Sequence, residues 1–281
     1  MLSYRHAFHA GNHADVLKHY VFSLVLGYFN QKDKPYWVID THAGAGMYAL
    51  KSEFAQKNVE FDTGVARLFD SKDLPESLDH YLKIVKNYNE NNALIFYPGS
   101  PKIAEYFLRS NDKLRLFELH PSDCKILLEN FAGQGRQTKV EMQDGFNGIK
   151  ACLPPPSKRA VILIDPPYEL KEDYLRVIDC MKDSLKRFAT GTYLICYPLL
   201  QRTEPLTMVD DLKKLQPNNW LDVSLSIEAP SADGFGMFGS GMFMINPPWT
   251  LPKILEETMP ILCDTLAIDN DANFTLSHNI S

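Results

Sequence analysis

The chain of 281 residues lacks the features that would place it in a membrane or in a disulfide-linked secreted fold. No apolar run is long enough to cross a bilayer, and the first residues lack the apolar segment of a signal peptide. Its five cysteines are scattered with no Cys-x-x-Cys pair, which argues against a zinc knuckle and for reduced thiols. We therefore expect a cytoplasmic protein with no membrane partner and no bound metal.

An excess of positive charge is also missing, since 29 Lys and Arg residues stand against 35 Asp and Glu. The net charge is -6, so the global basic footprint of many nucleic-acid-binding proteins is absent. If the protein binds RNA, the positive charge that contacts the RNA must be local. Apolar residues make up 45% of the chain, which at this length is enough for one large domain or for a domain with an insertion.

Strand-like apolar segments alternate with segments of helical periodicity along most of the chain. The predicted strands are 36–40, 113–119, 138–142, 160–164, 191–197, 221–228 and 241–246. The predicted helices are 101–110, 122–132, 145–152, 171–188 and 204–215. This alternation predicts an α/β fold whose mostly parallel sheet is covered on both faces. Because no helical pattern separates the last two strands, they should form an antiparallel hairpin with a long flexible loop at 229–240.

Residues 47–100 interrupt the alternation. The strand that ends at Glu118 follows the first strand by nearly eighty residues, whereas a nucleotide-binding unit has its second strand much closer. We interpret 47–100 as a helical insertion subdomain, which is either purely structural or serves as a lid or substrate platform. Residues 1–46 and 101–265 then form a Rossmann-like domain, and the polar residues 266–281 a loosely ordered tail.

The most informative motif is Asp-Pro-Pro-Tyr at 165–168, directly after the apolar strand 160–164. Proline has no N–H for the sheet, so the strand must stop and the motif must lie at the sheet edge. We expect Asp165 and the Pro166 carbonyl to accept the two N–H groups of an exocyclic amine, with the Tyr168 ring stacked on the base. The motif resembles that of amino-group methyltransferases, although a plain strand followed by a turn can carry the same residues.

Acids end four successive predicted strands: Asp40, Glu118, Asp144 and Asp165. Ligands of open α/β sheets bind beyond the carboxyl ends of the strands. After the first strand, Gly44 and Gly46 allow a tight turn and a close approach of backbone to ligand. Glu118 is placed to bind ribose hydroxyls and Asp144 to accept an adenine amine. The ordered series therefore predicts an S-adenosylmethionine site.

Two other motifs compete with this interpretation. Gly44–Ala49 satisfies the dinucleotide pattern Gly-x-Gly-x-x-Ala, but the acids about twenty residues further on do not end an apolar strand. A second motif, Asn-Pro-Pro-Trp at 246–249, also follows an apolar strand. Methyl transfer needs the motif at the fourth strand, beside the first glycine turn. We therefore interpret Asn246, which ends the seventh strand, as a structural stop.

Ser100 precedes Pro101 at the start of a predicted helix. Serine before proline is a good helix start, so Ser100 is expected to be the N-cap. A helix start can also present N–H groups to an anion such as a methionyl carboxylate.

The N-terminal segment 4–19 holds four of the eight histidines. Asn12 is predicted to cap a helix that has Asp15 in its first turn. Tyr4, Arg5, His6 and Lys18 are suited to stack on bases and contact phosphate. The plain alternative is a polar arm that lies over the domain.

Seven segments together resemble the bacterial 23S ribosomal RNA adenine-N6 methyltransferases of the J type: YRHAFHAGNHADVLKH, DTHAGAG, YPGSP, FELHPSD, QDGF, ILIDPPYE and MINPPW. The resemblance implies a Rossmann-like class I methyltransferase fold with seven strands and a small helical insertion. It implies methylation of one adenine, A2030 in the family, in protein-free 23S rRNA. It also implies that Tyr4 positions the RNA and that S-adenosylmethionine is contacted by His19, His42, Ser100, Glu118, Asp144, Gly145 and Asp165.

Three rival functions remain open on the sequence. A DNA adenine or protein glutamine N-methyltransferase would use the same Asp-Pro-Pro-Tyr motif, and would methylate DNA or protein but not rRNA. A dinucleotide oxidoreductase would bind NAD. A non-catalytic RNA-binding protein would bind rRNA without methyl transfer. For the methyltransferase we expect a monomer with 23S rRNA as its partner and no obligate protein partner.

Overall fold

The computed structural model describes residues 6–50, 59–91, 93–215 and 217–280. A parallel core runs through the main sheet, made of β1 (Trp37–Asp40), β4 (Lys113–Phe117), β5 (Thr138–Glu141), β6 (Ala160–Ile164) and β7 (Thr192–Leu199). β9 (Gly239–Ile245) is antiparallel to both β7 and β8 (Trp220–Ser226). The order across the sheet is β10-β8-β9-β7-β6-β1-β4-β5. The predicted Rossmann-like α/β fold and its terminal hairpin are thus confirmed.

Eight strands, rather than the predicted seven, make up this sheet among the described residues. The additional strand, β10 (Asn273–Asn279), pairs antiparallel with β8 along its whole length. Its half-buried Phe274 and Leu276 alternate with exposed polar residues. The prediction of a loosely ordered tail is therefore wrong for these residues, because a period of two in a short polar segment was not recognised as an edge strand.

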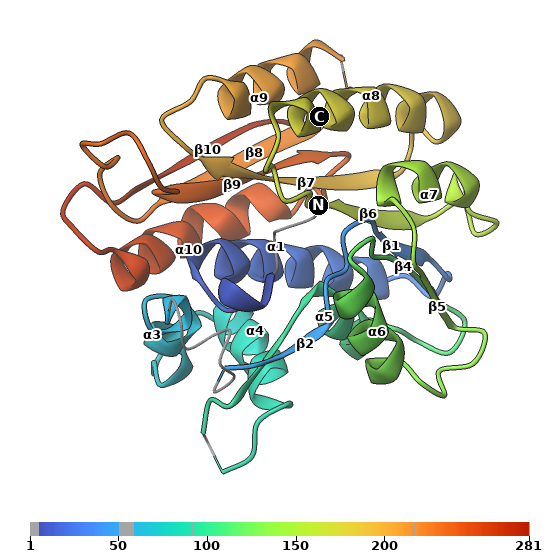
Figure 1. Ribbon diagram of the computed structural model, residues 1–281, viewed down its shortest axis with the longest axis horizontal. Coiled ribbons are helices and arrows are strands. Elements are labelled where there is room, and N and C mark those ends of the chain that lie inside the picture. The colour runs from blue at the N-terminus through green and yellow to red at the C-terminus, as the bar shows by residue number, and fades with distance from the viewer. Residues whose placement is uncertain (1–5, 51–58, 92, 216, 281) are drawn as a thin grey trace.

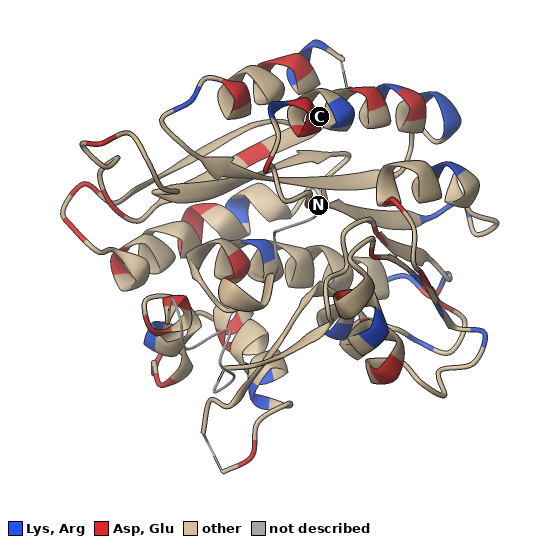
Figure 2. Cartoon of the chain, viewed as in Figure 1, with Lys and Arg blue, Asp and Glu red and all other residues tan. Residues whose placement is uncertain are grey.

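Two layers of helices cover the sheet (Figure 1). One face carries α7 (Gly145–Cys152), α8 (Lys171–Arg187) and α9 (Glu204–Lys214). The other carries α1 (His13–Asn30), α5 (Ser100–Phe107), α6 (Pro121–Asn130) and α10 (Leu251–Leu266), the last of which the sequence analysis missed. Basic and acidic residues are interspersed along α8 and α9 (Figure 2). Among the described residues, no helix combines the length and apolarity needed to span a bilayer.

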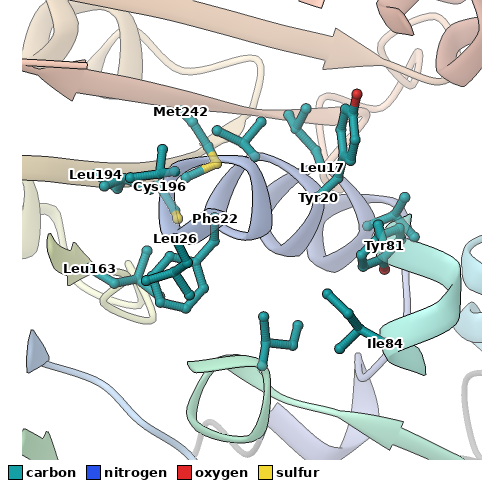
Figure 3. Packing of buried hydrophobic residues seen from close by; sticks show 14 of the residues in the cluster. Leu17, Tyr20, Phe22, Leu26, Tyr81, Ile84, Leu163, Leu194, Cys196 and Met242 are labelled. Atoms are coloured by element: carbon teal, nitrogen blue, oxygen red, sulfur yellow. The ribbon is translucent and has the colours of Figure 1, made fainter. Parts of the chain in front are cut away.

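Helix α1 lies between the sheet and the insertion. Leu17, Phe22 and Leu26 of α1 pack in the same cluster as Leu163, Leu194 and Met242 of the sheet. Tyr81 and Ile84 of α4 (Glu76–Lys86) lie on the other side of α1 (Figure 3). A helix that is apolar around most of its circumference must be buried between two layers. α1 therefore fixes its N-terminal polar residues at the edge of the sheet.

The insertion contains a short β-ribbon in addition to helices. β2 (Met47–Ala49) and β3 (Phe96–Pro98) pair antiparallel, and between them lie η2 (Glu60–Asp62), α3 (Val65–Phe69) and α4 (Glu76–Lys86). Residues 51–58 lie outside the described residues. Gly99 N donates to Gly46 O (2.9 Å), so the chain returns close to where it left the glycine turn. The purely helical description of 47–100 was therefore incomplete, and the division into domains remains a proposal.

The second Pro-Pro motif lies at the opposite edge of the sheet from the first. Because β9 is antiparallel to β7, Asn246 follows its end at the amino edge of the parallel strands. The Asn246 amide donates to Ala189 O and Gly191 O (2.8 Å each), and its backbone has a φ of 53°. These contacts support the interpretation of Asn246 as a structural stop.

Asn246→Ala should destabilise the protein by about 2–4 kcal/mol, because it removes two hydrogen bonds and because alanine tolerates the left-handed region less well than asparagine does. Asn246→Gly removes the same hydrogen bonds but tolerates the backbone, so its loss should be smaller, about 1–3 kcal/mol. Chemical denaturation measures both. Unchanged stability of both variants, or loss of methyl transfer by a folded variant, would contradict the structural assignment.

Candidate active site

A cavity of about 400 Å³ opens at the carboxyl edge of the parallel strands. Every predicted site residue within the described part of the chain lines it: His6, Lys18, His19, His42, Gly44, Ser100, Glu118, Asp144, Gly145, Asp165, Pro166 and Tyr168. Tyr4 and Arg5 lie outside the described residues. The carboxyl ends of parallel strands meet at one edge, which explains why residues so distant in sequence converge.

One half of the cavity is lined by residues that come directly after the ends of β1, β4 and β5. Glu118, after β4, accepts hydrogen bonds from Gly44 N (2.7 Å) and His120 N (2.6 Å). Burial raises the pKa of Glu118, and the two backbone N–H groups oppose that rise. A carboxylate can accept further hydrogen bonds at its remaining lone pairs, so a diol can still bind. Gly44 has a φ of +60°, and a β-carbon there would lie 2.2 Å from the Tyr48 hydroxyl.

Asp40 does not line the cavity itself but lies behind this half of it, where it contacts two residues that do. It is 1% exposed and accepts hydrogen bonds from Ser100 Oγ (2.6 Å) and His42 N (3.2 Å). Burial raises the pKa of Asp40 to about 6. The predicted N-cap role of Ser100 is wrong: Gly99 is the cap of α5, and the Ser100 hydroxyl is directed to Asp40 instead.

Asp144 and His42 lie at the β5 side of the cavity. Asp144 caps α7 through Phe146 N (3.0 Å) and pairs with Arg176 of α8 (Asp144 Oδ2 to Arg176 Nη2, 2.6 Å). Burial lowers the pKa of His42 to about 4, so its imidazole is neutral near pH 7. Its ring contacts Phe146 edge-on, with centroids 4.9 Å apart. Arg176 was missed by sequence reasoning, since nothing local links a residue in α8 to a strand-end acid.

A network of charged side chains connects α1 to the Asp-Pro-Pro-Tyr motif. Lys18 Nζ lies 2.7 Å from Asp165 Oδ2 and 2.8 Å from Asp15 Oδ1. Asp15 Oδ2 also accepts from His6 Nε2 and Gly11 N (2.9 Å each). Lys18 is only 7% exposed, so the phosphate contact predicted for it has no support in this placement. Its ammonium holds Asp165 instead.

The charged side chains in this network stabilise one another. Burial alone would raise the pKa of Asp15, but His6 and Lys18 hold it well below its usual range. Burial alone would lower the pKa of Lys18, but Asp15 and Asp165 hold it well above its usual range. Asp15 is positioned as predicted, because the Asn12 side chain caps α1 by accepting from Asp15 N (2.9 Å). At neutral pH the buried ammonium is therefore fully charged between two carboxylates.

Tyr168 lines the cavity with little freedom to move. Its hydroxyl donates to Cys196 O (2.6 Å), and its ring lies 4.6 Å from that of Tyr174. The side chain is 8% exposed and the backbone φ is 50°. A base could stack only on the side that Tyr174 leaves uncovered.

The polar groups of the cavity suit an adenosyl sulfonium cofactor. Glu118 provides a carboxylate at the end of β4, and the Gly44 turn brings backbone close to any ligand. His19 Nε2 is buried at the cavity and, among the described residues, has no hydrogen-bond partner, while His19 Nδ1 contacts the Tyr97 hydroxyl (2.8 Å). The nearest carboxylate oxygen, Asp15 Oδ1, is 4.0 Å from this nitrogen, too far for a hydrogen bond, so a polar ligand could supply the missing partner.

Comparison with known proteins agrees with the segments that suggested the resemblance. The family described as "Ribosomal RNA large subunit methyltransferase D, RlmJ" matches residues 33–277. The chain belongs to this family. It is 46% identical to "Ribosomal RNA large subunit methyltransferase J" of Escherichia coli (strain K12), over 99% of this chain and 98% of that protein. The protein of the same name from Haemophilus influenzae (strain ATCC 51907 / DSM 11121 / KW20 / Rd) is 44% identical over 98% of each chain.

A solved structure of a protein from Legionella pneumophila has a TM-score of 0.88 with 32% identity, and the match covers 96% of this chain and 98% of that one. The RlmJ family assignment therefore extends over nearly the whole chain, beyond the segments that first suggested it. The family match reaches residue 277, which lies within β10, in the segment that the sequence analysis interpreted as a loosely ordered tail.

The variant Asp40→Asn tests the raised pKa of Asp40 through the pH dependence of folding stability. An acid whose folded pKa lies near 6, against 3.8 when unfolded, loses folding stability as pH rises between those values. The asparagine variant cannot deprotonate. Its stability relative to the native chain should rise by roughly 2 kcal/mol from pH 4 to pH 6.5. Denaturation at several pH values measures this difference, and a flat difference would contradict the raised pKa.

Lys18→Met should lower the rate of methyl transfer by about 100-fold, because Asp165 loses the cation that orients it. It also leaves Asp15 without its cation, so Asp15→Asn combined with Lys18→Met is the control that restores charge balance. We expect the double variant to recover stability but not transfer. Normal transfer by either variant, measured under saturating cofactor and RNA, would exclude an orienting role for Lys18.

Proposed function

We propose that this protein transfers a methyl group from S-adenosylmethionine to N6 of one adenine, A2030 in the family, in protein-free 23S rRNA. The names of the Escherichia coli and Haemophilus influenzae relatives support a ribosomal RNA substrate. The observation that carries the proposal is Asp165 at the end of β6, oriented by Lys18, in one cavity with Glu118 and the glycine turn. We further propose a cytoplasmic monomer without an obligate protein partner.

Asp165 and Pro166 would bind the amine of the target base. Lys18 occupies Asp165 Oδ2, which leaves Oδ1 to accept one N–H, and the Pro166 carbonyl would accept the other. An adenine amine is a poor nucleophile because its lone pair is delocalised into the ring. Two acceptors draw the nitrogen towards a tetrahedral geometry and direct its lone pair at the methyl group. Tyr168 would hold the base by stacking, a contribution of about 1–3 kcal/mol.

The bound cofactor supplies an electrophilic methyl group on a sulfonium that leaves as a neutral thioether. Asp165 need not be a strong base, because the N6 proton becomes acidic only as the new C–N bond forms. Its carboxylate or the surrounding water can then take that proton. Most of the acceleration comes from holding the two reacting atoms in line. The roles of individual residues in the cavity follow from their placement and are part of the proposal.

Asp165→Ala should abolish methyl transfer while leaving cofactor binding largely intact. The substitution removes the acceptor for the amine but none of the contacts made by Glu118, Gly44 or Ser100. Transfer of tritiated methyl groups to a protein-free 23S rRNA transcript measures activity, and calorimetry with S-adenosylhomocysteine measures binding. Asp165→Asn is the matched control: it keeps the volume and one acceptor oxygen, so it should retain some activity.

Digestion of the product RNA to nucleosides identifies the modified atom. N6-methyladenosine is the expected product. A methyl group on a ring atom, or methylation of DNA or protein with none on rRNA, would overturn the proposed function. Normal turnover by Asp165→Ala would overturn the assignment of the catalytic carboxylate.

A further inference from the structure

Ser240 in β9 has a buried hydroxyl that the mechanism does not use. The residue lines the cavity and is 6% exposed, yet its Oγ has no hydrogen-bond partner among the residues that the structure describes. Other hydroxyls of the same sheet are paired: Ser224 with Thr275 (2.7 Å), and Thr192 with Asn246 O (2.9 Å). Buried polar groups are nearly always hydrogen-bonded, so this buried hydroxyl without a partner, in a residue that lines the cavity, points to a ligand contact.

Ser240 and Asp165 lie on the same face of the sheet. Side chains alternate between the two faces along a strand. Leu163 and Met242 both belong to the core cluster that packs against α1, and Asp165 and Ser240 each stand two residues away from one of them. The contact between Asp165 and Lys18 of α1 agrees with this placement.

The register of the strands gives the separation of the two residues. Ile164 pairs with Ile195, so Asp165 is level with Cys196, which pairs with Met242. Ser240 is therefore two strands away from Asp165 and two residues further beyond the carboxyl edge. Strands about 4.8 Å apart with a rise of about 3.3 Å per residue place the two Cα atoms about 12 Å apart.

That separation is longer than a purine. When the amine of the target adenine is at Asp165, the cofactor occupies the β1, β4 and β5 side, and the rest of the nucleotide must extend towards β7 and β9. The part that reaches Ser240 is then the ribose. The cavity residues next to Ser240 in the sheet and loop, Pro198, Met237 and Met242, carry no charge, which suits a neutral hydroxyl better than a phosphate.

We propose that Ser240 Oγ forms a hydrogen bond with the ribose 2′-hydroxyl of the target adenosine and so favours RNA over DNA. Both groups can donate and accept, and the 2′-hydroxyl is the atom that lets a protein tell RNA from DNA at one nucleotide. The inference rests on the proposed function, since it takes the position of the adenine from Asp165. It adds a specificity residue that an Asp-Pro-Pro-Tyr motif, shared with enzymes that methylate DNA, does not supply.

A double-mutant cycle tests the pairing. Two RNA substrates are identical except that the target nucleotide is adenosine in one and 2′-deoxyadenosine in the other. The native chain and Ser240→Ala are compared on both by kcat/KM. The native chain should lose about 3- to 10-fold on the deoxy substrate, and Ser240→Ala should lose the same factor on the ribose substrate. The variant should lose nothing more on the deoxy substrate, because the bond is already absent.

Ser224→Ala is the matched control, since it removes an equally buried serine hydroxyl from β8 outside the cavity. It should discriminate between the two substrates as the native chain does. If Ser240→Ala still discriminates by the native factor, or matches the native chain on the ribose substrate, the proposal is wrong. If the native chain transfers no methyl group to the ribose substrate, the proposed function fails instead, so the two failures are distinguishable.

Discussion

The ion pair between Lys18 and Asp165 is the constraint on which the candidate site depends. It joins a residue of α1 to the end of β6, 147 positions later in the chain, across 2.7 Å. A buried ammonium is stable only when opposite charges surround it, and here Asp15 and Asp165 provide them. Because α1 is packed between the sheet and α4, the backbone that carries the Lys18 ammonium is held in place (Figure 3). The orientation of the Asp165 carboxylate, the proposed catalytic group, is thus set by the core of the protein.

Much of the fold and most of the cavity could be predicted from the sequence because both follow from periodic signals. Apolar strands alternating with helices specify a parallel sheet, and acids at successive strand ends must then meet at one edge. The predictions that failed concerned residues whose positions depend on tertiary contacts. The Ser100 hydroxyl donates to Asp40 instead of capping α5. The Lys18 ammonium is buried between two carboxylates instead of being available to phosphate. Neither the partner in space nor the degree of burial of such residues is visible in local spacing.

The direction of β9 explains how one chain can carry two Pro-Pro motifs with different roles. Both stop an apolar strand for the same reason, the missing N–H of proline. β6 is parallel to β1, so Asp165 lies beside the glycine turn, whereas β9 is antiparallel to β7 and leaves Asn246 at the far edge. There the Asn246 amide is occupied by two backbone carbonyls. Topology, rather than the motif, determines which of the two can take part in chemistry.

The charges near the cavity also limit how it can recognise RNA. Two cations that line it, Lys18 and Arg176, are both paired with carboxylates, and the chain as a whole has a net charge of -6. Along α8 and α9 the basic residues are interspersed with acidic ones (Figure 2). Phosphate attraction, which dominates most nucleic-acid binding, therefore cannot be supplied by these two cations while they remain paired. Recognition within the cavity must then rest on hydrogen bonds and stacking, for which the unpartnered Ser240 hydroxyl and the fixed Tyr168 ring are suited.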